Sequence, residues 1–233
     1  MGLESQTRKA IEAVLFDADG TLFDSGDAVY FLVRDLFSEK GWPMKDRDSI
    51  VSLIGKTNKE IAEILVPQEF RRDEQAFKEW ATEAERRWIE YYLPKYVRTM
   101  DNAREVLETL RGMGFKLGMV SNGSAKEIPL YLRGGDLEGY FSAVITADHV
   151  KRPKPFPDPL FKATSQLGVA PDRAMYVGDT ILDALSARAA GMFLALILSG
   201  IGRREDLINE KPDILIESIK DLPEAIVSFV GSC

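Results

Sequence analysis

The sequence predicts an α/β protein in which a parallel β-sheet is flanked by helices and a helical bundle is inserted after the first strand. Three observations lead to this fold class. A short apolar run at 13–16 ends in an acidic turn, and the stretch 27–96 carries helical periodicity almost throughout. From residue 101 onward, apolar runs alternate with helical segments. Such alternation is typical of β-α-β units, whose strands are parallel.

The first strand is expected from Ala13 to Phe16, because this run is short, apolar and followed by turn residues. Asp17 and Asp19 come directly after it, and Gly20 permits a tight turn. Burying two ionised carboxylates within a sheet is costly, so we expect both at the carboxyl end of the strand, facing a cleft or a cation. Hard divalent cations such as Mg²⁺ prefer such oxygen ligands. Taken alone, the pair is equally compatible with an ordinary turn.

Two helices are expected early in the inserted region. Apolar residues recur at helical spacing over 29–37, and Gly41 ends that helix. Thr57 and Glu60 form the pattern of a capping box, which predicts that a second helix begins there and stops before Pro67.

A third helix is expected over about 71–93, closed by Pro94. Its apolar stripe consists of Phe77, Trp80, Ala84, Trp88 and Tyr91. We interpret this stripe as the core of the bundle. Hinges between the bundle and the sheet are expected near 24–27 and 96–100.

The remaining elements alternate. Strands are expected at 115–120, 143–146, 174–177 and 193–198, with a short edge strand at 213–216. Helices are expected at 103–110, 160–167, 183–190 and 222–230. Glycines follow the first three of these helices, as is typical of helix ends.

The composition excludes several classes of protein. The net charge of −7 and the pI of about 5.0 argue against binding to nucleic acid or an anionic membrane. The first ten residues hold no apolar signal-peptide core, and no apolar run approaches the roughly 20 residues of a membrane span. We therefore expect a cytoplasmic protein, as a monomer or a homodimer. The single cysteine, Cys233, excludes an internal disulfide, and the single histidine, His149, is expected in a surface loop.

Polar residues follow the second expected strand. Ser121, Asn122 and Gly123 lie at a strand-to-helix turn, where a hydroxyl and exposed backbone N–H groups can bind an anion. By itself this segment is a common turn.

The segment after the third strand is a stiff, proline-rich loop. Prolines at 153, 155, 157 and 159 prevent a helix before residue 157. A stiff loop can hold the Lys154 ammonium in place as a point charge for phosphate. By itself Lys154 is more simply interpreted as a solvated side chain.

A second acidic pair follows the fourth strand. Asp179 and Asp183 lie four residues apart where a helix begins, and Thr180 is placed to cap that helix. Two carboxylates one turn apart repel each other unless a cation lies near them.

These four segments, in this order, resemble the signatures of the haloacid dehalogenase-like (HAD) hydrolase superfamily. The first is Asp17-Ala18-Asp19-Gly20-Thr21-Leu22-Phe23-Asp24-Ser25, the third contains Lys154, and the fourth is Gly178-Asp179-Thr180-Ile181-Leu182-Asp183. The resemblance is greatest to the phosphatase branch, such as phosphoglycolate phosphatases. It spans 14–183, and the tail from Gly200 adds nothing to it.

The resemblance implies a Rossmann-like parallel sheet core with helices on both faces. The implied boundaries are residues 1–24 and 97–233 for the hydrolase core domain and 25–96 for a helical cap. A cap that closes over the site suggests small phosphorylated metabolites as substrates. Cap residues near Gly55, Lys56 and Thr57 are candidates for contacts to the leaving group.

The resemblance also implies roles for single residues. Asp17 is the nucleophile and Asp19 the general acid and base. Mg²⁺ is held by the Asp17 carboxylate, the Asp19 backbone carbonyl and Asp179. Further residues complete the implied site: Ser121, Asn122 and Lys154 as phosphate ligands, and Asp183, Gly20, Thr21 and Gly123 in support.

The sequence leaves several activities open. We expect a Mg²⁺-dependent phosphatase that forms an aspartyl-phosphate, with a phosphoglycolate-like ester among the candidate substrates. The main alternative is a phosphomutase of the β-phosphoglucomutase type. A pyrophosphatase, a haloacid dehalogenase and a non-catalytic phospho-receiver are less favoured; the acidic Asp19 argues against a dehalogenase, which carries a non-acidic residue there.

Overall fold

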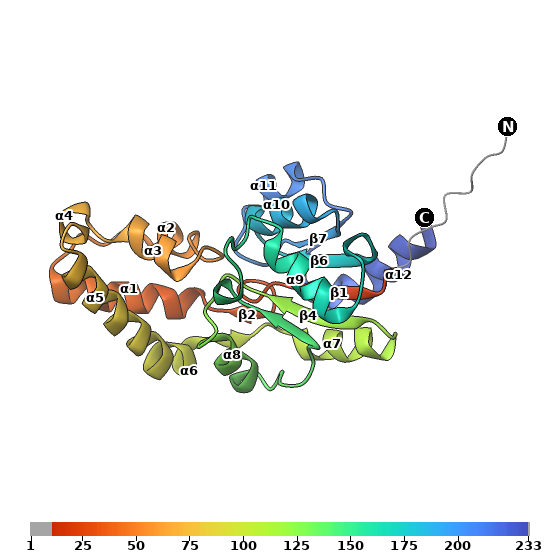
Figure 1. The fold of residues 1–233 in the computed structure, drawn as a ribbon, viewed down its shortest axis with the longest axis horizontal. Helices are drawn as coiled ribbons and strands as arrows, with labels where there is room; N and C mark the ends of the chain where they lie inside the picture. The colour runs from red at the N-terminus through yellow and green to blue at the C-terminus, as the bar shows by residue number, and fades with distance from the viewer. Residues whose placement is uncertain (1–10, 233) are drawn as a thin grey trace.

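A parallel six-stranded sheet forms the centre of the protein in a computed structural model that describes residues 11–232 (Figure 1). Its order is β5-β4-β1-β6-β7-β8, and every neighbouring pair is parallel. The strands are β1 (Ala13–Phe16), β4 (Lys116–Val120), β5 (Ala143–Ile145), β6 (Ala174–Gly178), β7 (Phe193–Ile197) and β8 (Ile214–Ile216). The predicted strands and their parallel arrangement are confirmed, with β1 at the centre of the sheet.

Helices cover both faces of the sheet, as predicted. One face is covered by α7 (Ala103–Gly112), α8 (Ile128–Gly134) and α12 (Leu222–Ser232), and the other by α9 (Asp158–Leu167), α10 (Ile181–Ala190) and α11 (Arg204–Asn209). Side chains of β1 alternate between two hydrophobic clusters: Val14 and Phe16 belong to one, and Ala13 and Leu15 to the other. Burial on both sides explains why β1 is a continuous apolar run.

A separate helical region, residues 26–96, extends to one side of the sheet (Figure 1). Its helices are α1 (Gly26–Lys40), α2 (Arg47–Val51), α3 (Asn58–Leu65), α4 (Gln68–Arg71), α5 (Glu74–Arg87), the π-helical turn η1 (Trp88–Tyr92) and α6 (Leu93–Tyr96). An antiparallel pair, β2 (Phe23–Asp24) with β3 (Arg98–Thr99), joins it to the sheet. The pair lies next to both predicted hinges.

Several helix ends lie at the residues where the sequence predicted them. Thr57 and Glu60 form the reciprocal bonds of a capping box at the start of α3. Gly41 ends α1 and Gly191 ends α10, each with the left-handed backbone that glycine adopts without a steric penalty. His149 is exposed in a short 3₁₀ turn, as expected of a surface residue.

The third predicted helix required two corrections. Pro94 does not end it, because the chain widens into the π-helical turn η1 and continues as α6. Pro94 lies at the start of α6, directly after the wider turn η1, and cannot donate a backbone hydrogen bond to the preceding turn. Tyr91, predicted in the bundle core, is 48% exposed, whereas Trp88 is buried. The wider turn rotates Tyr91 away from the apolar stripe.

Sequence patterns did not identify α2, α8 or α11, all of which are short. Among residues 11–232, no helix is both long enough and apolar enough to cross a membrane. Cys233 and the polar segment 1–10 lie outside the described residues.

Candidate active site

The predicted polar residues converge at the carboxyl ends of the central strands. Asp17 follows β1, Ser121 follows β4 and Asp179 follows β6. Oxygen atoms of Asp17, Asp179 and Asp183 all lie within 4.8 Å of one another, and all three carboxylates are buried. Lys154 enters from the loop after β5, so residues from four separate segments share one site.

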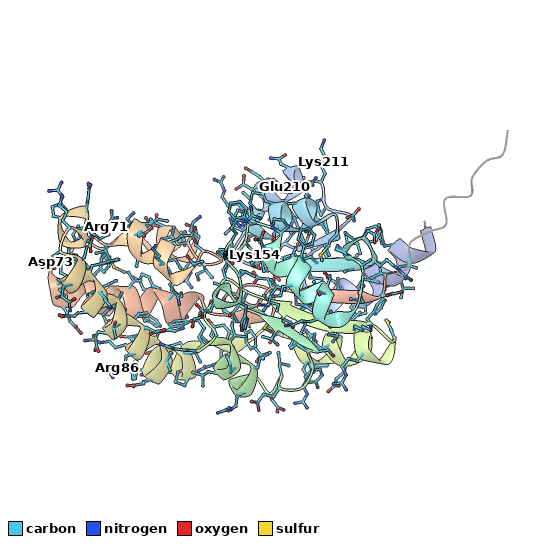
Figure 2. The ribbon with its side chains drawn as sticks, in the orientation of Figure 1. Arg71, Asp73, Arg86, Lys154, Glu210 and Lys211 are labelled. Carbon is cyan, nitrogen blue, oxygen red and sulfur yellow. The ribbon has the colours of Figure 1, made fainter. Side chains whose placement is uncertain are left out.

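Lys154 is an interior residue, unlike the other labelled charged side chains, which lie at the periphery of the molecule (Figure 2). Its Nζ lies 2.7 Å from Asp17 Oδ1 and 2.6 Å from Asp183 Oδ1, and it donates a hydrogen bond to the hydroxyl of Tyr176 at 3.0 Å. Burial opposes the charged form, but the carboxylates of Asp17 and Asp183 outweigh it and raise the pKa of Lys154. The interpretation of Lys154 as a solvated loop residue is therefore wrong.

The two carboxylate oxygens of Asp17 differ in their bonding partners. Oδ1 accepts a hydrogen bond from the Ala18 N–H at 2.7 Å and pairs with Lys154. Oδ2 is buried and has no hydrogen-bond partner among the described residues. Burial, and then the charge of Asp183, raises the pKa of Asp17 well above its usual value. An unpartnered buried carboxylate oxygen is costly, so Oδ2 is suited to bind a cation or to react.

Two separate segments hold the Asp179 side chain. Its Oδ1 accepts a hydrogen bond from Thr21 Oγ1 at 2.8 Å, and its Oδ2 accepts one from the Ile201 N–H at 2.7 Å. A Cβ atom at Gly20 or at Gly200 would overlap this carboxylate. Burial, followed by the charge of Asp183, raises the pKa of Asp179 to about 7. The loop at Gly200 thus belongs to the site, although the sequence analysis assigned no role to the tail from Gly200.

Asp183 holds Lys154 and the turn before α10. Its Oδ1 contacts Lys154, and its Oδ2 accepts hydrogen bonds from the Thr180 hydroxyl at 2.6 Å and the Thr180 N–H at 3.0 Å. Burial alone would raise its pKa, but Lys154 lowers it. These bonds complete the cap predicted at Thr180.

The donor set fits a divalent cation such as Mg²⁺. The ligand atoms are all oxygens, three carboxylates face one ammonium, and Asp17 Oδ2 is unpartnered within the described chain. The excess negative charge would be neutralised by such an ion. Asp17 Oδ2 has no partner and each oxygen of Asp179 accepts one hydrogen bond, so these two carboxylates have the capacity to hold it. Both oxygens of Asp183 instead bond several groups, Lys154 among them.

Asp19 lies at the outer side of the cluster and is less buried than Asp17. The hydroxyl of Tyr131 donates a hydrogen bond to Asp19 Oδ1 at 2.9 Å. Burial raises the pKa of Asp19 despite this bond. A carboxyl group whose pKa is raised is suited to carry and transfer a proton.

Ser121 and Asn122 differ in what their side chains do. Ser121 Oγ accepts a hydrogen bond from the Gly123 N–H at 2.9 Å. The Asn122 side chain instead accepts from the Lys154 N–H and donates to the carbonyls of Lys154 and Gly55, each at 2.9 Å. Asn122 therefore fixes the Lys154 loop and binds the helical region.

Sequence reasoning missed Glu127, which places a buried carboxyl group at the same site. It accepts hydrogen bonds from the Trp88 indole N–H at 2.5 Å, from the Ser124 N–H, and from the Asn58 amide at 3.5 Å. Burial, and then Asp19, raises the pKa of Glu127 to about 7. The spacing of Ser124 and Glu127 is that of a capping box, so the sequence did hold a signal for this residue.

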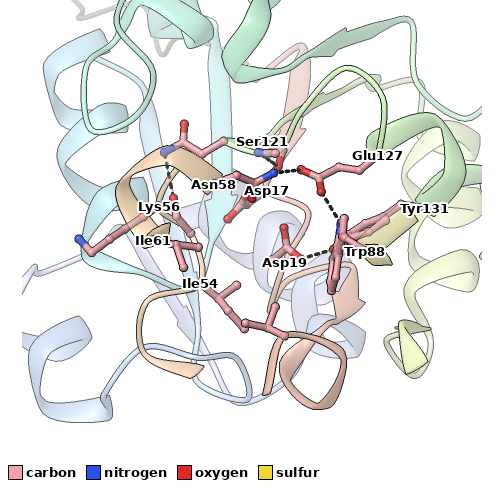
Figure 3. A pocket seen from close by; sticks show the side chains of 14 residues that line it. Asp17, Asp19, Ile54, Lys56, Asn58, Ile61, Trp88, Ser121, Glu127 and Tyr131 are labelled. Carbon is pink, nitrogen blue, oxygen red and sulfur yellow. Dashed lines mark hydrogen bonds between the residues drawn. The ribbon is translucent and has the colours of Figure 1, made fainter. Parts of the chain in front are cut away.

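The acidic site opens into a small pocket of about 40 Å³ (Figure 3). The core contributes its polar wall, and the helical region contributes its opposite wall. The lining residues of the helical region are Val29, Ile54, Gly55, Lys56, Asn58, Ile61 and Trp88. Gly55 and Lys56, predicted near a leaving group, do line this pocket, whereas Thr57 caps α3.

Comparisons with known proteins agree with this geometry. A pyrophosphatase PpaX of Anoxybacillus flavithermus is 29% identical over 212 residues, covering 91% of this chain and 95% of the relative. A phosphoglycolate phosphatase of Nitrosospira multiformis is 30% identical over 224 residues, covering 93% and 96%.

Two solved structures share the fold. A predicted phosphoglycolate phosphatase of Haemophilus somnus has a TM-score of 0.84 at 21% identity, covering 92% of this chain and 97% of that one. A β-phosphoglucomutase of Clostridium difficile has a TM-score of 0.79 at 22% identity, covering 95% and 98%. The family model described as haloacid dehalogenase-like hydrolase matches residues 14–197. The chain therefore belongs to the haloacid dehalogenase-like hydrolase family.

Proposed function

We propose that this enzyme is a Mg²⁺-dependent phosphatase that hydrolyses phosphate monoesters of small molecules through an aspartyl-phosphate. One observation carries the proposal. Asp17 Oδ2 is buried and unpartnered among the described residues, while Oδ1 of the same carboxylate is fixed by Lys154 and the Ala18 N–H. The group is thus oriented with a single free oxygen, as a nucleophile must be.

In the first step, Asp17 Oδ2 forms a bond to phosphorus as the bond from phosphorus to the ester oxygen breaks. A carboxylate and a phosphate dianion repel each other, so the approach needs positive charge. Lys154 lies 2.7 Å from the attacking carboxylate and supplies part of it. Mg²⁺, when held by Asp17, Asp179 and the Asp19 backbone carbonyl, would neutralise the phosphoryl oxygens further.

Asp19 then has two tasks. It donates a proton to the departing ester oxygen, and it later accepts a proton from the water that cleaves the aspartyl-phosphate. The pKa of Asp19, raised by burial, supports this role because it favours a protonated carboxyl group, and the hydrogen bond from Tyr131 positions that group. Ser121, with N–H groups of the following turn, would bind the phosphoryl oxygens.

The helical region acts in this proposal as a cap, with residues 25–96 moving relative to a core made of 1–24 and 97–233. The helical region forms one wall of the catalytic pocket, which supports this assignment. The β2–β3 pair also supports it, because the chain enters the helical region directly after β2 and returns to the core through β3. Closure would exclude water during the first step.

A phosphomutase is the second candidate, because a solved β-phosphoglucomutase shares the fold. It would return the phosphoryl group from Asp17 to a sugar hydroxyl rather than to water. Supplying a hexose phosphate and measuring isomerised product against free phosphate separates the two. The relative named a pyrophosphatase adds inorganic pyrophosphate to the substrates that should be tested.

The test is phosphate release from a panel of phosphate monoesters, with Mg²⁺ and with EDTA. We expect turnover with Mg²⁺, loss with EDTA, and recovery when Mg²⁺ is added back. An equal rate in EDTA would overturn the metal assignment. No release from any ester or from pyrophosphate would overturn the hydrolase proposal.

A further inference from the structure

The helical region contains an apolar groove separate from the acidic site. Its volume is about 380 Å³, much larger than the 40 Å³ of the pocket at Asp17. Side chains of α1, α3 and α5 line it, among them Leu32, Phe77 and Trp80. The stripe predicted as bundle core thus borders open space along part of its length. Well-packed helical bundles leave few such voids, so a groove of this size is a candidate binding site for a ligand.

The groove adjoins the catalytic pocket. Val29, Asn58, Ile61 and Trp88 line both cavities. Trp88 donates its indole N–H to Glu127, so this shared wall contacts the core directly. The groove and the acidic site are therefore separated by no more than these side chains.

One buried polar atom at the groove lacks a partner. The indole N–H of Trp80, a lining residue, has no hydrogen-bond acceptor among residues 11–232. Buried donors are nearly always bonded in native proteins. A water molecule at the edge of the groove would satisfy this donor, because the hydrocarbon part of a ligand has no hydrogen-bond acceptor.

The charged residues of the catalytic pocket restrict which alcohols can serve as the leaving group of the substrate. Beyond Asp17 and Asp19, its remaining carboxylate is Glu127, which is buried and faces the helical region. Lys56 is the one cationic residue among those lining the pocket, and its ammonium points away from Asp17 and Glu127 (Figure 3). A second anionic group on the substrate would meet Glu127, whose hydrogen-bond donors among the described residues are Trp88, Ser124 and Asn58, all of them uncharged. Val29, Ile54 and Ile61 make the rest of that wall apolar.

We infer that the substrates are phosphate monoesters of uncharged, apolar alcohols, whose hydrocarbon part passes the shared wall and occupies the groove of the helical region. This inference rests on the proposed phosphatase function and narrows it. It places the phosphoryl group at Asp17 and the alkyl chain against Leu32, Phe77 and Trp80. It also disfavours esters whose alcohol carries a carboxylate, including phosphoglycolate.

The first test is a chain-length series with the Mg²⁺-loaded enzyme, from methyl phosphate to n-hexyl phosphate. Each added methylene buries apolar surface, so kcat/KM should rise by about two- to fourfold per methylene. Values that stay flat or fall with length would overturn the inference and leave the proposed phosphatase intact. No phosphate release from any ester would instead overturn the proposed function, and the inference with it.

A groove-filling variant localises the effect. Ala81→Leu projects a larger side chain into the groove and should lower the ratio of kcat/KM for hexyl phosphate to that for methyl phosphate by about tenfold. Ala76→Leu, on the same helix but outside the groove lining, is the matched control and should keep the wild-type ratio. Equal ratios in the two variants would place the alkyl chain elsewhere.

Binding can be followed without turnover. Trp80 lines the groove but not the catalytic pocket, whereas Trp88 lines both, so hexylphosphonate should change the tryptophan emission of the wild-type enzyme more than methylphosphonate does. The same response to both ligands, or to neither, would contradict binding in the groove. This readout does not depend on whether Ala81→Leu folds.

A charge variant tests the anion filter. Glu127→Gln should raise the ratio of kcat/KM for phosphoglycolate to that for ethyl phosphate by about tenfold at pH 8, because a like-charge contact is removed. Glu105→Gln changes an exposed glutamate of α7 and serves as the control. An unchanged ratio in Glu127→Gln would contradict the role of Glu127.

Discussion

The acidic site and the groove of the helical region are built on opposite principles. At the site, Asp17, Asp179, Asp183 and Lys154 are buried and joined by short ion pairs or a shared cluster, so each side chain has little freedom. The groove, by contrast, is apolar and loosely packed. The chemistry therefore takes place where charges are fixed, whereas selection of a leaving group uses the open space of the groove.

Removing the nucleophile should have the largest effect on the site. Asp17→Asn keeps the size of the side chain but removes the attacking oxygen, so kcat should fall by at least about 10⁴-fold. The variant also removes one of three clustered negative charges, so its melting temperature should not fall. Steady-state kinetics measure kcat, and thermal unfolding measures the melting temperature.

Asp48→Asn, at an exposed position in α2, is the control for this substitution. If Asp17→Asn retained a wild-type rate, Asp17 would not be the nucleophile.

Removing Lys154 should damage both activity and stability. Lys154→Ala leaves Asp17 and Asp183 buried without their cation, which should lower the free energy of unfolding by about 3–5 kcal/mol. The lost charge should lower kcat by about 10²–10³-fold. Chemical denaturation and kinetics on the folded fraction give the two values.

Lys151→Ala, an exposed neighbour in the same loop, should change neither value. A loss of activity below about threefold in Lys154→Ala would mean that Lys154 has no role on the phosphoryl group.

Glu127 links the two regions and should make stability depend on pH. Its pKa is raised from 4.5 to about 7 on folding, so the unfolded state releases the proton first as pH rises. Stability should therefore fall between about pH 4.5 and pH 7, by at most roughly 3 kcal/mol from this group. Glu127→Gln should lose that decline, so its gain over wild type should be larger at pH 8 than at pH 4.5. An equal difference at both pH values would show that Glu127 is not titrating in this range.

The smallest effect is expected at Tyr131. Tyr131→Phe removes the hydrogen bond to Asp19 and should lower kcat by about tenfold, with little change in KM. The acidic or basic limb of the pH–rate profile assigned to Asp19 should shift as well. A lower rate with an unchanged profile would indicate that Tyr131 acts only through packing.

The sequence predicted most of the acidic site because its residues follow strands. Asp17 and Asp179 come directly after apolar runs, and parallel strands bring such positions to one edge of a sheet. Resemblance to a known family then supplied the roles of Lys154 and Ser121, which their own local patterns did not require.

What the sequence did not reveal depends on contacts between distant segments. Tyr131 reaches the site from α8 and Glu127 from the residue just before it, and this short helix has no strong periodic signal. Ile201 binds Asp179 only because the loop after β7 passes the end of β6. The groove arises because α1, α3 and α5 do not close on their shared apolar faces, and no local pattern encodes the distance between helices.

The central claim is that Asp17 becomes phosphorylated during turnover, and acid quenching followed by mass spectrometry tests it most directly. Enzyme mixed with Mg²⁺ and a substrate ester is stopped within one turnover and digested. We expect a phosphoryl group on the peptide that contains Asp17 in the wild-type enzyme, and none on that peptide in Asp17→Asn. A phosphoryl group on another residue, or an unmodified enzyme at a time when phosphate is being released, would contradict it.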